Sequence, residues 1–128
     1  MSFVVKKKII ALIPARQGSE RIKNKNIVNF FSHPLLAYAI QSALKSKLFE
    51  KVVVSTDSSK YRKVAKYYGA EVPCLRPKKI SSSTSSDYEW VNYTIDLYKK
   101  KNIHFTHFFI LRPTNPFRTE NTIKDAWK

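Results

Sequence analysis

Arginine, lysine and small polar side chains gather in three short segments of this sequence, which hold its best candidates for chemistry. Five of the six arginines lie in these segments, and only Arg62 falls within a helical pattern. The guanidinium group is a planar fork of donors that matches carboxylate and phosphate oxygens. Together with a glycine that lets backbone N–H groups approach an anion, this set suits the binding of a polyanion. The segments contain Arg16, Gly18, Ser19, Arg21, Lys23, Lys25 and Asn26, then Arg76, and then Arg112, Thr114, Asn115 and Arg118.

Several familiar motifs are absent from the sequence. The chain has only two glycines, and their spacing matches neither the G-x-G-x-x-G dinucleotide motif nor the Walker loop. It also lacks the G-x-S-x-G motif of serine hydrolases, the H-E-x-x-H zinc motif and paired cysteines. His33, His104 and His107 are scattered, and we interpret them as surface or structural residues. The sequence therefore predicts no metal site within this chain.

The elements that must position the candidate residues alternate between strands and helices. Such alternation predicts an α/β fold of the Rossmann-like type, with three layers, a mostly parallel sheet and right-handed crossovers. In open sheets of this kind, ligands bind beyond the carboxyl ends of the strands, and the candidate segments follow strand ends. Strands are predicted at Lys8–Pro14, Lys51–Thr56, Glu71–Leu75 and Phe105–Leu111, and helices from Pro34, after Asp57 or Ser58, from Ser86 and after Thr119.

Helix boundaries and buried faces can also be predicted. Ser86 and Glu89 have the spacing of a capping box, and Gly69 is placed to end the second helix in a left-handed conformation. Asp57 could serve as a metal ligand, but we interpret it as a helix cap. The predicted apolar stripes are Leu36, Ala39, Ile40, Ala43 and Leu44 in the first helix, Tyr61, Val64, Ala65 and Tyr68 in the second, and Val91, Ile95 and Tyr98 in the third.

Composition limits the classes of protein that fit. The chain has 128 residues, enough for one domain with a modest core, and no apolar stretch approaches the ~20 residues that cross a bilayer. A single cysteine and the lack of a signal peptide favour a soluble cytoplasmic protein without a membrane partner. The formal net charge of +15 keeps a nucleic-acid-binding module open as an alternative. No recognition motif supports that alternative, so we expect no nucleic-acid partner.

Four segments together resemble one enzyme family. The segment PARQGSERIKNKN resembles the P-A-R-x-G-S-K-R-x-x-x-K-N loop of the acylneuraminate cytidylyltransferases, which also include enzymes for related nine-carbon acidic sugars. Three further segments follow in the family's order and with the family's spacing along the sequence: VVVSTDS, EVPCLRP and ILRPTNPFRT. The resemblance therefore spans nearly the whole chain. The resemblance implies a fold of the nucleotide-diphospho-sugar transferase type, with residues 1–128 as the N-terminal nucleotide-binding part of the domain.

The resemblance also implies roles for individual residues. The first loop of the family wraps CTP, which assigns nucleotide binding to Arg16, Gly18, Ser19, Arg21, Lys25 and Asn26. Among them, Arg16, Arg21 and Lys25 would supply the catalytic positive charge. Arg76 and Ser85 match family residues near the cytidine. The last segment lies where the family meets the sugar acid, which implies substrate binding by Arg112, Thr114, Asn115 and Arg118.

The sequence also departs from the family pattern. Glu20 replaces a lysine, Asp87 stands where several relatives have serine, and Arg112 stands where sialic acid enzymes typically have glutamine. The identity of the acidic sugar therefore stays open, and an eight-carbon acid is an alternative. Family members continue well beyond this length, with Mg²⁺-binding aspartates and much of a homodimer interface in the continuation. We therefore expect a truncated front part that binds CTP and an acidic sugar, with poor or no turnover alone.

Overall fold

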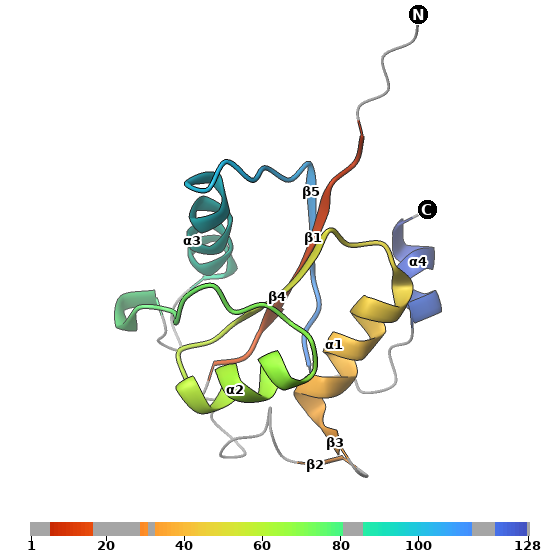
Figure 1. Cartoon of the computed structure of the whole chain (residues 1–128), viewed down its shortest axis with the longest axis horizontal. Coiled ribbons are helices and arrows are strands. Elements are labelled where there is room, and N and C mark those ends of the chain that lie inside the picture. The colour runs from red at the N-terminus through yellow and green to blue at the C-terminus, as the bar shows by residue number, and fades with distance from the viewer. Residues whose placement is uncertain (1–5, 17–28, 31–32, 81–85, 114–119, 128) are drawn as a thin grey trace, which may run out of the picture.

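The computed structural model describes residues 6–16, 29–30, 33–80, 86–113 and 120–127. Strands and helices alternate along most of the chain, as the sequence predicts, but within these residues no strand separates the second α-helix from the third. Figure 1 shows the helices arranged around a small central sheet. Two very short strands in the segment before the first helix were not predicted. In chain order the elements are β1 (Ile9–Pro14), β2 (Asn29–Phe30), β3 (His33–Pro34), α1 (Leu35–Ser46), β4 (Lys51–Ser55), α2 (Ser59–Tyr67), the 3-10 turn η2 (Lys78–Ile80), α3 (Asp87–Lys99), β5 (His107–Ile110) and α4 (Glu120–Trp127).

The main sheet is parallel and has β1 at its centre. Its order is β4-β1-β5, with Leu12 opposite Val53 on one side and opposite Ile110 on the other. The predicted strand at Glu71–Leu75 is reduced to a single parallel bridge between Glu71 and Val53. Pro73 accounts for this difference, because proline has no N–H to donate to a sheet ladder.

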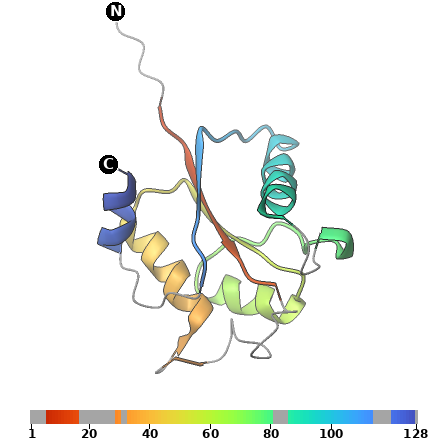
Figure 2. The same cartoon turned by 180° about the vertical axis from the view of Figure 1, so that it is seen from behind.

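Helices cover both faces of the sheet, which confirms the predicted three layers. Ala11 and Ile13 of β1 face α1, α2 and α4, whereas Ile10 and Leu12 face α3. Figures 1 and 2 both show α3 apart from α1 and α4. The side chains of Ile10 to Ile13 are completely buried, as expected for a continuous apolar run in a central parallel strand.

The helix ends follow local sequence signals, with two corrections. Ser86 and Glu89 form the predicted capping box of α3, and Gly69 has the predicted left-handed conformation with φ of 101°. The interpretation of Asp57 as a cap is wrong, since Ser58 caps α2 by accepting a hydrogen bond from the Tyr61 N–H. Pro34 was predicted to be the first helical residue, but it is the N-cap of α1, and the helix begins one residue later at Leu35.

The predicted buried stripes are largely confirmed. In α1 the one exception is Leu44, whose side chain remains 39% exposed. In α3 the buried set extends beyond the prediction to Trp90 and Thr94. The three histidines all lie on the surface, as interpreted from the sequence. Within the described ranges, no helix is long and apolar enough to cross a membrane.

The strand order reverses at β1. From β1 the chain adds β4 and then the Glu71 bridge on one side, and it returns with β5 on the other side. The carboxyl ends of β1 and β5 are therefore neighbours at a topological switch point. In doubly wound α/β sheets, this is where ligands bind.

Candidate functional site

Three of the predicted site residues lie within the described residues, and each follows the end of a sheet segment. Arg16 follows β1, where the Ala15 N–H still donates to the Ser55 carbonyl at 2.9 Å. Arg112 follows β5, whose pairing with β1 extends to the Leu111 N–H. Arg76 follows the segment that is bridged to β4. The other predicted site residues lie outside the described residues; they are Gly18, Ser19, Arg21, Lys25, Asn26, Ser85, Thr114, Asn115 and Arg118.

Arg76 is held tightly against the end of β4. Its backbone N–H donates to the Thr56 carbonyl at 2.7 Å, and its side chain is only 7% exposed. The guanidinium Nε donates to Ser55 Oγ at 3.1 Å, and Nη2 donates to the Ser55 carbonyl at 3.2 Å. Arg76 therefore fixes the carboxyl end of β4, and its guanidinium group is part of the protein framework at this edge.

The first turn of α3 links Arg76 to Arg112. The guanidinium carbon of Arg76 lies 5.3 Å from the centroid of the Trp90 ring, which is cation–π distance. The Trp90 indole N–H donates to Asp87 Oδ1 at 2.9 Å. Asp87 Oδ2 in turn accepts a hydrogen bond from Arg112 Nη2. A continuous chain of contacts thus runs from the end of β4 to the end of β5.

Charges of both signs act on one another at this edge. Burial lowers the pKa of the Arg76 guanidinium, and the charge of Arg16 lowers it further, whereas Asp57 and Asp87 act to raise it. The like charges of Arg16 and Arg76 therefore oppose each other. A phosphate or carboxylate bound at this edge would offset part of that repulsion.

The described residues do not form a metal site. No three His, Cys, Asp or Glu side chains within them converge to hold a metal ion. Asp57 and Asp87 are the two carboxylates that act electrostatically on Arg76. Mg²⁺ is usually held by one or two carboxylates together with substrate phosphates and water, so two carboxylates alone do not make a complete Mg²⁺ site.

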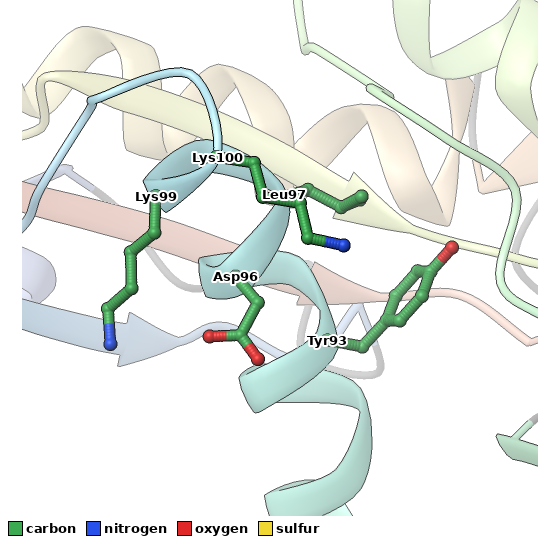
Figure 3. A pocket seen from close by; sticks show the side chains of 5 residues that line it. All are labelled: Tyr93, Asp96, Leu97, Lys99 and Lys100. Carbon is green, nitrogen blue, oxygen red and sulfur yellow. The ribbon is translucent and has the colours of Figure 1, made fainter.

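A pocket of about 250 Å³ lies elsewhere on the molecule. It runs along the second half of α3, where Figure 3 shows the side chains that line it: Tyr93, Asp96, Leu97, Lys99 and Lys100. The linked arginines contact the first turn of the same helix, at Asp87 and Trp90, and neither of them lines the pocket. The pocket is therefore separate from the edge described above.

Three residues of this network are not predicted from the sequence as site residues. Ser55 is predicted only as part of a strand, Trp90 has no predicted role, and Asp87 is only a departure from the family pattern. A signal for two of them exists, because Asp87 and Trp90 are three residues apart at the start of a predicted helix and so share one face. The partner of Ser55 is 21 residues away, and no local signal indicates that contact.

Comparisons with known proteins support one family. The sequence profile described as cytidylyltransferase matches residues 10–128. The chain is 42% identical over 121 residues to an N-acylneuraminate cytidylyltransferase of Escherichia coli O18:K1:H7, covering 94% of this chain and 28% of that protein. It is 37% identical to a pseudaminic acid cytidylyltransferase of Campylobacter jejuni, covering 94% of this chain and 52% of that protein.

A solved structure shares the fold. It is a CMP:2-keto-3-deoxy-manno-octonic acid synthetase complexed with CTP, with a TM-score of 0.74 and 18% sequence identity. The match covers 94% of this chain and 46% of that chain. This chain therefore spans about half, or less, of the length of the proteins that it matches.

Proposed function

Because this chain belongs to the cytidylyltransferase family, we propose that residues 1–128 are the N-terminal nucleotide-binding part of an enzyme that transfers CMP from CTP to an acidic sugar. The acidic sugar is of the nonulosonic type, the class named in the relatives from Escherichia coli and Campylobacter jejuni. One observation carries the proposal: Arg16 and Arg112 follow the neighbouring strands β1 and β5 at the switch point of the sheet, and Arg76 follows the segment bridged to β4 at the same edge.

The nucleotide is proposed to bind at the β1 and β4 side of this edge. Arg16 would contact phosphate, and the like charge of Arg76 at the same edge favours the binding of an anion there. The framework bonds of Arg76 to Ser55 suggest that it shapes the cytidine subsite as much as it contacts the nucleotide. Gly18, Ser19, Arg21, Lys25, Asn26 and Ser85 complete the proposed nucleotide site.

The proposed reaction is an in-line displacement at the α-phosphorus of CTP. A sugar hydroxyl oxygen forms the new P–O bond, the bond to the β-phosphate bridge oxygen breaks, and pyrophosphate leaves. Arg16, Arg21 and Lys25 would offset the charge that develops on the phosphates, and most of the catalytic effect would come from positioning and charge stabilisation. The proton of the attacking hydroxyl is assigned to no residue of this chain.

The acidic sugar is proposed to bind on the β5 side. Arg112 follows β5, and Thr114, Asn115 and Arg118 come next in the sequence. A guanidinium group at this position suits the sugar carboxylate. We further propose that Mg²⁺ accompanies CTP, with its protein ligands in the part of the relatives that this chain does not span, and that the full-length enzyme is a homodimer.

Thermal unfolding with CTP, UTP, ATP and GTP, each with and without Mg²⁺, tests nucleotide binding. A ligand at 100 times its Kd adds about 2.7 kcal/mol of stability. In a domain of 128 residues this raises the Tm by roughly 10 °C. We expect CTP to produce a clearly larger shift than the other three. Arg16→Ala should abolish the shift, whereas the control Arg62→Ala on α2 should keep it.

Equal shifts with all four nucleotides, or an unchanged CTP shift in Arg16→Ala, would refute the nucleotide site. A second candidate function is a CTP-binding chain without turnover, which the limited coverage of the relatives favours. Release of pyrophosphate from CTP, Mg²⁺ and N-acetylneuraminic or pseudaminic acid separates the two candidates.

A further inference from the structure

A carboxylate in the first turn of α3 contacts both Arg112 and a buried residue of the core. Asp87 is the first residue of α3, and its two oxygens have different partners. Oδ1 accepts from the Trp90 indole at 2.9 Å, and Oδ2 accepts from Arg112. Asp87 therefore connects the exposed arginine after β5 to a residue of the core.

The core side of this connection is rigid. Trp90 is 2% exposed and packs in one cluster with Ile10 and Leu12 of β1 and Val53 of β4. Its ring also lies beneath the guanidinium group of Arg76, which is itself bound to Ser55. One oxygen of Asp87 is thus fixed by a buried group, and this leaves the other oxygen in a defined position for Arg112.

The solvent side of the connection is exposed. The side chains of Arg112 and Asp87 are 52% and 47% exposed. An ion pair at this level of exposure contributes little to stability. Its main physical effect is to limit the rotamers of a long side chain, and an arginine that is already ordered loses less entropy when it binds an anion.

The negative charge of Asp87 would by itself weaken anion binding by Arg112. At this site that charge is already offset, because Asp87 also acts on Arg76 and lies at the N-terminus of a helix of 13 residues. Arg16 adds a further positive charge near Arg76. These positive charges reduce the amount by which Asp87 would weaken anion binding.

We propose that Asp87 is the positioning residue of the acidic-sugar subsite, holding Arg112 in the orientation in which it binds the sugar carboxylate. This inference rests on the proposed function, and it adds a residue that acts through Arg112 without contacting the substrate. It also gives Trp90 a role, as the buried anchor of that orientation.

The test measures binding of two substrates by the 128-residue chain. Isothermal titration calorimetry gives the Kd of CTP, and then the Kd of N-acetylneuraminic acid and of pseudaminic acid at saturating CTP. Asp87→Asn keeps the size of the side chain and an acceptor for the Trp90 indole, but it removes the charge that holds Arg112. Asp96→Asn, in the second half of the same helix, is the matched control.

We expect Asp87→Asn to raise the Kd of the bound acid by about three- to tenfold, the range set by ordering one long side chain. The Kd of CTP should stay within about twofold, and Asp96→Asn should change neither value. Arg112→Met should weaken acid binding, and adding Asp87→Asn to it should cause no further loss. This non-additivity distinguishes positioning of Arg112 from a general structural role.

An unchanged or lower Kd for the acid in Asp87→Asn would overturn the inference while leaving CTP binding intact. Additive losses in the double variant would also overturn it. So would the absence of acid binding by a wild-type chain that binds CTP. A wild-type chain that shows no CTP-selective stabilisation would instead contradict the proposed function on which the inference rests.

Discussion

Arg76→Ala tests whether the guanidinium group of Arg76 is part of the framework of the sheet edge. The change removes two hydrogen bonds from a charged donor to Ser55 and the cation–π contact with Trp90. Hydrogen bonds to a charged group contribute about 1.5–3 kcal/mol each, and a desolvated cation–π contact contributes about 2 kcal/mol. The variant also no longer has to bury a charge, which offsets part of this loss. We expect a net loss of about 3 kcal/mol.

The corresponding change in Tm is large enough to measure easily. At about 2.1 cal/mol/K per residue, unfolding of 128 residues has an entropy of roughly 0.27 kcal/mol/K. A loss of about 3 kcal/mol therefore lowers the Tm by about 11 °C. Differential scanning calorimetry without nucleotide gives this value directly, and urea unfolding gives the free energy independently.

Two further variants make the measurement specific. Arg76→Lys keeps the charge, but a single ammonium group cannot reproduce the planar fork that reaches both oxygens of Ser55, so it should recover less than half of the loss. Arg62→Ala removes an arginine whose buried Nε has no hydrogen-bond partner among the described residues, and it should cost less than about 1 kcal/mol. A Tm for Arg76→Ala within 2 °C of the wild-type value would refute the framework role, as would equal losses in Arg76→Ala and Arg62→Ala.

Three more predictions concern the framework around the site. Gly69→Ala should lower the free energy of unfolding by about 1–2 kcal/mol, because φ is 101° and the new Cβ would lie 3.1 Å from Cδ1 of Leu44. Urea unfolding measures this loss, and an unchanged free energy would show that the alanine is not strained at this position. Ser58→Ala should lower the stability of the fold by about 1 kcal/mol, because the Tyr61 N–H loses its cap, and Asp57→Ala should lower it by less. A larger loss of Tm in Asp57→Ala than in Ser58→Ala would show that Asp57 is the cap. Burial and Glu71 raise the pKa of Tyr98 above its usual 10.0, so the folded state favours the neutral phenol. The contribution of Tyr98 to the free energy of unfolding is therefore complete below pH 10 and declines as the pH rises further. Urea unfolding between pH 8 and 11 should show a smaller decline of this free energy in Tyr98→Phe than in the wild type.

Features that depend on neighbouring residues could be predicted from the sequence. The run at Lys8–Pro14 predicts a strand that is buried on both faces, because it is apolar at every position. The capping box of Ser86 and Glu89 and the left-handed Gly69 are local in the same sense, since they need only a few adjacent residues. The order of these elements was sufficient to predict the fold class and the edge at which the arginines lie.

Features that depend on distant segments could not be predicted in this way. How much of Leu44 is buried depends on which distant segments pack against α1. The choice between Asp57 and Ser58 as the cap depends on which side chain reaches the Tyr61 N–H. The contacts of Arg76 and Trp90 join segments that helical periodicity alone does not bring together. Periodicity did predict a buried face for α3, but it could not indicate that an arginine from another segment covers the ring.

The central position of β1 also has a consequence for the order of events during synthesis. Lys8, directly before β1, pairs with Thr106, 98 residues later, directly before β5. At about 5–20 residues per second, a ribosome needs on the order of 5–20 s to add those residues. Throughout that time the apolar run Ile9–Pro14 has at most β4 as a partner strand, and its other edge stays unpaired. The nascent chain therefore carries a strand with one unpaired edge until β5 has been synthesised, and an unpaired edge of this kind is prone to aggregate.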